Sequence, residues 1–252
     1  MKNKVKIIAT PVLILIYWQL VSSSGLVSSY LLPPPYMVAT AAQNMLENGV
    51  LINHILTSLE RVFQGFLISC FLAFNVALLT HWSSTLEHLV SAPLALLRMI
   101  PPLAMTPLLI LWLGIGNATQ LSIIVLASVF PIYLNIRDGL QRVRPEYREL
   151  ASSLGLSPLR FFTFIMIPSA VPSIVTGVRL GFGYSWRALI GAELIAASAG
   201  LGFLIIDSQE MMRTDDVMVG ILTIGLIGWL LDTLFYRVVC GRITHRFPEV
   251  AK

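Results

Sequence analysis

Long apolar runs, separated by short polar or proline-containing stretches, dominate the chain. A hydrocarbon layer about 30 Å thick is crossed by about 20 helical residues, and several of the runs approach or reach that length. The pattern therefore predicts an all-α integral membrane protein with six transmembrane helices. The predicted spans cover residues 7–26, 62–80, 90–113, 118–136, 166–192 and 217–239.

Two connections between the spans carry local signals of their own. Three consecutive prolines, Pro33 to Pro35, end the first helix, because each lacks a backbone N–H. Residues 36–48 then predict a short helix across the outer face that Gly49 closes. Residues 193–212 are partly apolar but contain three acidic residues and many glycines and serines. We expect them to form a connection at the membrane surface.

The composition excludes a water-soluble globular protein. Apolar residues make up 56% of the chain and charged residues only 12%, and the mean hydropathy is +0.79. A soluble domain carries about a quarter charged residues, and its large surface needs polar cover. No internal repeat or soluble segment interrupts the pattern, so we expect residues 1–252 to form one transmembrane domain in a lipid bilayer.

Basic residues indicate the orientation of the spans, because cytoplasmic loops are enriched in Lys and Arg. If the N-terminus is inside, the outer residues 27–55 and 114–117 contain no Lys or Arg, and the outer residues 193–216 contain only Arg213. The basic residues on the inside are then Lys2, Lys4, Lys6, Arg137, Arg142, Arg144, Arg148, Arg160, Arg237, Arg242, Arg246 and Lys252. Both termini are therefore expected in the cytoplasm. The first apolar run is also compatible with a cleaved signal peptide, which would leave the downstream orientation unchanged.

Several kinds of chemistry find no support in the sequence. All four lysines lie within a few residues of a terminus, so no interior lysine can serve a P-loop that binds ATP. Cys70 and Cys240 are predicted at different membrane depths and indicate neither a disulfide nor a zinc site. The four histidines lack H-E-x-x-H spacing, and no nucleophile has an evident base. We expect no enzymatic activity, metal site or cofactor in this chain, and the positive-inside rule explains its net charge of +4 without nucleic acid.

The inner loop of residues 137–164 is unusually long and predicts a helical hairpin. Pro145 suits the first turn of a short amphipathic helix, and Gly155 supplies the left-handed residue that ends it. Ser157 can then cap a second helix with Pro158 at its first position. From these features alone, a surface helix that only orders the loop remains equally compatible.

The loop carries a motif that resembles the EAA motif of ABC importer permeases, which reads E-A-A, three residues, G, nine residues, I-x-L-P. The spacing matches at every position, while Leu150 and Ile167 replace an Ala and a Leu with other apolar residues. By this resemblance the hairpin contains a cytoplasmic coupling helix that enters a groove on an ATPase subunit. The residues assigned to coupling are Glu149, Leu150, Ala151, Gly155, Leu156, Ile165, Ile167 and Pro168.

The resemblance extends over most of the chain. The segments that carry it are residues 58–62, Gly65-Phe66, 98–104, 111–116, 177–181, Trp186 and Ala192-Glu193. They are similar to the branch of ABC importer permeases that moves nitrate, taurine, alkanesulfonates, bicarbonate and some vitamin precursors. The resemblance implies a type I importer permease fold in a bacterial cytoplasmic membrane. It also implies a second permease copy, two ATPase subunits that bind ATP and Mg, and an external substrate-binding protein.

Charged residues at membrane depth are costly and are candidates for function. Arg98 lies in the third span if that helix begins near Leu89, but it is only interfacial if the crossing starts at Pro101-Pro102. Prolines in this span leave backbone carbonyls without their helical hydrogen-bond donors. Such carbonyls are tolerated in a membrane where protein or a cavity surrounds them. We therefore expect the third span to line a translocation path.

The fifth span contains two further arginines, Arg179 and Arg187. Arg179 matches the resemblance and favours a structural ion pair, whereas Arg187 is the better candidate for contact with solute. Asp232 and Glu193 are possible partners, without an assignment of pairs. Two aromatic residues beside Arg187 are included as path candidates, although such side chains more often pack or anchor the helix at the interface. They are Tyr184 and Trp186.

Close packing of the fifth span is predicted by Gly177-x-x-x-Gly181, which permits either a contact within one subunit or a contact between two permeases. Taken together, the sequence predicts a permease subunit that moves a small polar, anionic solute by alternating access. A six-span carrier driven by an ion gradient is the main alternative. It would need an ion site in the membrane, for which only Asp232 and Glu193 are available, and it leaves the long loop unexplained.

Overall fold

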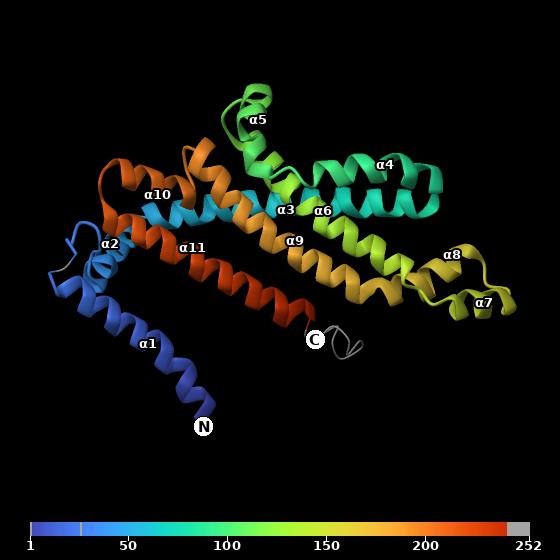
Figure 1. Cartoon of the computed structure of the whole chain (residues 1–252), viewed down its shortest axis with the longest axis horizontal. Coiled ribbons are helices and arrows are strands. Elements are labelled where there is room, and N and C mark those ends of the chain that lie inside the picture. The colour runs from blue at the N-terminus through green and yellow to red at the C-terminus, as the bar shows by residue number, and fades with distance from the viewer. Residues whose placement is uncertain (1, 26, 241–252) are drawn as a thin grey trace.

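The protein is an elongated bundle of helices in a computed structural model that describes residues 2–25 and 27–240 (Figure 1). Four long helices run along the bundle: α3 (Val50–Trp82), α6 (Asn117–Gln141), α9 (Ile167–Ala196) and α11 (Thr214–Phe235). The described residues contain helices and no strands, which confirms the all-α prediction. The basic residues Arg242, Arg246 and Lys252 lie outside the described part.

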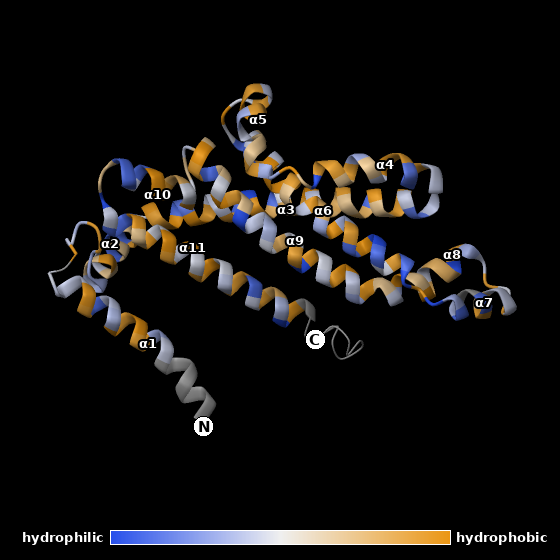
Figure 2. Ribbon diagram, in the orientation of Figure 1, coloured by the Kyte–Doolittle hydropathy of each residue, from blue (hydrophilic) through white to orange (hydrophobic). Residues whose placement is uncertain are grey.

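Shorter helices occupy the two ends of the bundle. At one end lie α2 (Pro35–Glu47) and α10 (Leu201–Glu210), and at the other lie α7 (Pro145–Ser153) and α8 (Pro158–Phe161) (Figure 1). The helix α1 (Lys2–Ser23) diverges from the bundle beside α2. Hydrophobic residues predominate along α3 and α4 (Ser84–Leu97), whereas hydrophilic residues are more frequent in the end connections (Figure 2).

The described residues contain four helical segments long and apolar enough to cross a membrane, or five if one bent pair of helices counts as a single span. The first span predicted, residues 7–26, corresponds to α1, whose apolar stretch Thr10–Ser23 is shorter than these. Residue 26 lies outside the described part. A count of six spans therefore remains a prediction that depends on α1.

The third span is not the single helix predicted over residues 90–113. It is broken into α4, a 3-10 turn (Pro102–Met105) and α5 (Thr106–Leu113), and the two halves are bent by 86°. Pro101 and Pro102 cause the break, because they cannot donate the backbone hydrogen bonds that would continue α4. Arg98 is the C-terminal cap of α4 at this break, so it does not lie within a continuous helix.

Two other boundaries differ from the prediction. The helix α3 begins at Val50 rather than near residue 62. Ser58 and Arg61 in this added part are buried, whereas Asn53 and Glu60 are exposed. The connection predicted over residues 193–212 contains α10, which packs on α9 and α11. Gly200, at φ 117°, separates α9 from α10. The short helix predicted over residues 36–48 is confirmed as α2.

The core of the bundle is the packing of α6 against α9 and α3. A Cβ atom on Gly177 would lie 2.5 Å from Cβ of Asn135, and one on Gly181 would lie 2.6 Å from Cδ1 of Ile132. Both neighbours belong to α6, so the two glycines bring helices together within one subunit.

Replacing Gly181 with alanine is expected to lower the free energy of unfolding by about 1–3 kcal/mol, because the added methyl group overlaps Ile132. The measurement is thermal unfolding of the purified protein in detergent, followed by circular dichroism. The matched control is Gly183→Ala on the same helix, where a Cβ atom meets nothing within 4 Å. Equal stability of the two variants would contradict this packing of α9 on α6.

Candidate coupling hairpin and solute path

The helices α7 and α8 form the hairpin predicted for the inner loop. Gly155 adopts φ 63°, and the N–H of Leu156 donates to the carbonyl of Ala151 at 2.9 Å. The N–H of Gly155 donates to the carbonyl of Ser152 at 3.1 Å. These two bonds are the Schellman arrangement, in which a left-handed residue lets the chain satisfy the last carbonyls of a helix. The turn is therefore fixed by backbone geometry at Gly155.

The second arm of the hairpin leads without a break into the long helix α9. Ser157 caps α8 by accepting a hydrogen bond from the N–H of Arg160, and Pro158 occupies the first turn. A π-helical turn (Phe162–Met166) then joins α8 to α9, and its flanking residues keep right-handed helical torsions. Pro168 lies in the first turn of α9, where its missing N–H costs little. The hairpin and α9 thus form one continuous helical path.

The coupling residues predicted from the sequence divide into two groups. Glu149 and Leu150 are exposed on α7, whereas Ala151 is buried beneath the hairpin turn. Leu156, Ile165, Ile167 and Pro168 are half-buried where the hairpin meets the bundle. The hairpin also exposes several large apolar side chains, which is unusual for a helix surrounded only by water. They are Tyr147, Leu150, Leu154 and Leu159.

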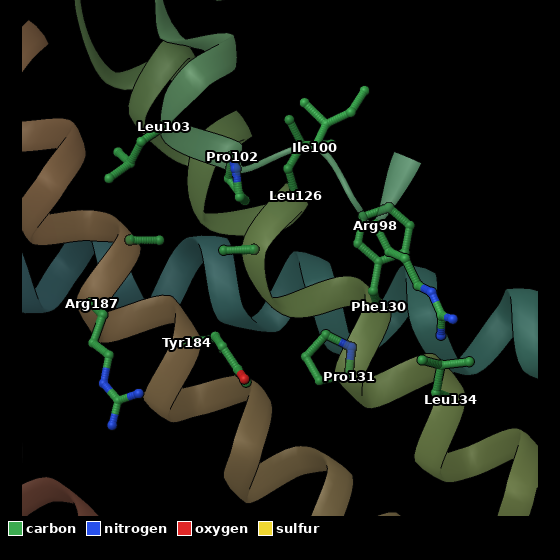
Figure 3. A pocket seen from close by; sticks show the side chains of 12 residues that line it. Arg98, Ile100, Pro102, Leu103, Leu126, Phe130, Pro131, Leu134, Tyr184 and Arg187 are labelled. Carbon is green, nitrogen blue, oxygen red and sulfur yellow. The ribbon is translucent and has the colours of Figure 1, made fainter. Parts of the chain in front are cut away.

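A hollow of about 410 Å³ lies between the break in the third span, α6 and α9 (Figure 3). Three of the predicted path residues line it: Arg98, Tyr184 and Arg187. Arg98 and Arg187 stand at opposite ends of the row of lining side chains, with Tyr184 and Pro131 between them (Figure 3). The two guanidinium groups therefore line an elongated space rather than converging on one point.

The charges around this hollow are unbalanced. Within the described part of the chain, the guanidinium groups of Arg98 and Arg187 have no acidic or hydrogen-bonding partner. Most of the remaining lining is apolar, from residues such as Leu103, Phe130 and Ala188. A positively charged, mostly apolar hollow attracts a small anion and disfavours a cation.

The other two path candidates lie elsewhere. Arg179 donates to Asp232 from Nε at 3.0 Å and from Nη2 at 2.8 Å, and its guanidinium lies 5.1 Å from the ring centre of Tyr236. This bidentate pair joins α9 to α11. It agrees with the structural ion pair that the sequence favoured for Arg179. Trp186 is buried in the core, where a Cβ atom on Gly228 would lie 2.7 Å from its Nε1. It packs against α11 and does not line the hollow.

Sequence reasoning missed a buried network at the α10 end of the bundle. Arg61 donates from Nη1 to Oε1 of Glu193 at 2.9 Å, and Ser58 donates from Oγ to both carboxylate oxygens at 2.8 and 2.9 Å. Gly202 donates its N–H to Oε2 of Glu193 at 3.0 Å, and Arg61 also donates to Oδ1 of Asn117. The network joins α3, α6, α9 and α10. Ser58 and Arg61 lie three residues apart on one helix face, and residues 58–62 and Ala192-Glu193 belong to the family resemblance, but neither signal assigns the pairing.

Residues 2–25 and 27–240 contain no group of three or more His, Cys, Asp or Glu side chains that could hold a metal ion. The polar groups that line the hollow are guanidinium and phenol groups.

Comparison with known proteins identifies the family of the chain. Residues 65–239 match the model of the binding-protein-dependent transport system inner membrane component. The chain belongs to this family. The resemblance stated from the sequence is thereby confirmed, and the chain is a permease component of an ABC transporter.

This permease has curated relatives that align over most of their length. It is 38% identical over 222 residues to the putative aliphatic sulfonates transport permease protein SsuC of Escherichia coli, covering 88% of this chain and 84% of the relative. It is 33% identical over 248 residues to the taurine transport system permease protein TauC of Escherichia coli, covering 96% and 90%. A chain of the MetNI methionine ABC transporter, in an inward-facing conformation, superposes with a TM-score of 0.65 at 16% identity, covering 76% and 95%. This likeness confirms the permease fold.

Proposed function

We propose that this permease forms the membrane path of an ATP-driven importer for a small oxyanion of the sulfonate class. The observation that supports this most is the hollow lined by Arg98 and Arg187, whose guanidinium groups have no acidic partner in the described residues. Sulfonate oxygens accept charge-assisted hydrogen bonds from guanidinium groups. The names of the SsuC and TauC relatives, which refer to aliphatic sulfonates and taurine, favour the same class.

The hairpin of α7 and α8 is the proposed contact with the ATPase. Its exposed apolar residues, among them Leu150 and Leu154, suit a groove on a partner protein better than open water. Two ATPase subunits would bind ATP and Mg, and a second copy of this permease would complete the path. An external substrate-binding protein would deliver the solute to the end of the bundle formed by α2 and α10. In this assembly the hairpin and both termini face the cytoplasm, and the membrane is the bacterial inner membrane.

Coupling follows from the continuous helical connection. Closure of the ATP-bound ATPase dimer moves the hairpin, and the π-helical turn Phe162–Met166 passes this displacement to α9, which carries Arg187. ATP and the external binding protein favour the outward-open state, and their release favours the inward-open state. Each ligand shifts the equilibrium only by its difference in affinity for the two states.

A carrier driven by an ion gradient is less well supported. It would need a carboxylate free to bind and release an ion within the membrane. The two carboxylates considered for that role are each paired with an arginine, Glu193 with Arg61 and Asp232 with Arg179. Both pairs instead hold helices together.

Replacing Arg98 or Arg187 with glutamine is expected to reduce ATP-dependent uptake of ethanesulfonate about fivefold each, the effect of losing about 1 kcal/mol of attraction at a water-accessible site. The measurement is the initial rate of uptake into proteoliposomes that contain the permease, its ATPase and its binding protein. Arg142→Gln is the control, because this exposed arginine lies outside the hollow. Unchanged uptake in both test variants would rule out the arginine-lined path.

A further inference from the structure

A second hollow of about 230 Å³ adjoins the first and extends to Arg137, near the end of α6 that leads into the hairpin. It lies between α4 and α6, and Arg98 belongs to the walls of both hollows. Its other polar lining groups are Ser91, Tyr133 and Arg137. Three arginines therefore follow one another along the path, in the order Arg187, Arg98 and Arg137.

Arg137 differs from the other two because it already holds a carboxylate. It donates from Nε to Oε1 of Glu87 at 3.1 Å and from Nη2 to the same oxygen. Gln141 donates from Nε2 to this oxygen at 3.2 Å. Glu87 lies on α4, one helical turn from Ser91, so the ion pair joins α4 to α6 beside the second hollow, which Arg137 lines.

The ion pair of Arg137 and Glu87 is accessible to water, so another anion can replace Glu87. The side chains of Arg137 and Glu87 are 30% and 28% exposed, unlike the buried pair of Arg61 and Glu193 at 9% and 0%. A water-accessible ion pair contributes at most about 1 kcal/mol, so a second anion can compete for the same guanidinium at little cost. A sulfonate carries the same kind of acceptor oxygens as the Glu87 carboxylate.

We propose that Arg137 is a further anion site on the path and that Glu87 occupies it whenever no solute is present. The inference rests on the proposed anion path. A solute anion that passes Arg98 displaces Glu87 from Arg137, and the freed carboxylate then repels the anion. Glu87 thereby lowers the affinity of Arg137 for the solute anion. A low affinity at this last site favours release of the anion toward the hairpin side.

The test is the binding of radiolabelled ethanesulfonate to the permease assembled with its ATPase subunits in lipid nanodiscs, without the external binding protein. Glu87→Gln is expected to tighten binding about fivefold, because Arg137 loses its internal competitor. Arg137→Gln is expected to weaken binding about fivefold. Glu210→Gln and Arg142→Gln are the charge-matched controls, since both residues are exposed and neither lines the hollow, and both should bind like the original protein.

Opposite shifts from the two halves of one ion pair are the decisive result. An ion pair that only ties α4 to α6 would change binding in the same direction in both variants, or would change only thermal stability, and either result overturns the proposal. If Arg137→Gln does not assemble, a Glu87→Gln variant that binds no more tightly overturns it alone. ATP-dependent uptake by the unaltered transporter tests the proposed function separately, so uptake without opposite shifts would refute only this site.

Discussion

Replacing Glu193 with alanine is expected to lower the free energy of unfolding by about 3–5 kcal/mol, the usual cost of leaving one partner of a buried ion pair without its counter-charge. Glu193 is 1% exposed and Arg61 is 8% exposed, so water cannot replace the lost carboxylate. The variant also removes the acceptor for the Ser58 hydroxyl and the Gly202 N–H. Thermal unfolding in detergent and the yield of folded protein measure the effect.

Glu210→Ala is the matched control for this experiment, because Glu210 is an exposed carboxylate at the end of α10. Its loss should change the free energy of unfolding by no more than about 0.5 kcal/mol. A Glu193→Ala variant as stable as Glu210→Ala would show that the ion pair of Glu193 with Arg61 does not stabilise the fold, and the role given to this network would then be wrong.

Replacing Gly155 with valine is expected to reduce ATP-coupled uptake by up to about thirtyfold while leaving insertion into the membrane intact. A β-branched residue at φ 63° is strained by about 2 kcal/mol, which lowers the equilibrium constant for the native turn about thirtyfold and sets the upper limit of the loss. A Cβ atom at this position meets nothing within 4 Å, so the effect comes from the backbone alone. The measurements are uptake into proteoliposomes and ATP hydrolysis by the assembled transporter.

Gly155→Asn separates backbone strain from any other effect of a side chain at this position. Asparagine tolerates the left-handed conformation, so this variant should retain most of the uptake. If valine and asparagine reduced uptake equally, contact of the added side chain with the ATPase would explain the loss, and the turn geometry would not.

The hairpin could be predicted from the sequence because its signals are local. Proline at a helix start, serine at a cap and glycine at a left-handed turn each act within a few residues, and Pro145, Ser157 and Gly155 all act as predicted. The break in the third span was also signalled locally by Pro101-Pro102, but a hydropathy window averages over it. Its bend of 86° depends on the packing of α5, which no local rule supplies.

The charge pairs could not be assigned from the sequence, because they join residues far apart in the chain. Glu193 was considered as a partner for an arginine of its own span, but it pairs with Arg61 on α3, 132 residues away. The helix α3 starts at Val50, twelve residues earlier than hydropathy indicates, and this added segment carries Arg61. Hydropathy placed that segment outside the membrane because it counts polar residues without showing which of them find partners inside the bundle.

The buried network around Glu193 also determines how α9 can move. Since this network fixes α9 near one end, a push at the hairpin is expected to swing the helix about that fixed point instead of sliding it along its axis. Arg187 is six residues from Glu193, or about 9 Å, whereas Pro168 is 25 residues away, or about 38 Å. A swing of this kind would move Arg187 by about a quarter of the displacement at Pro168. A displacement that the ATPase imposes on the hairpin would thus reach Arg187 as a smaller displacement with a larger force.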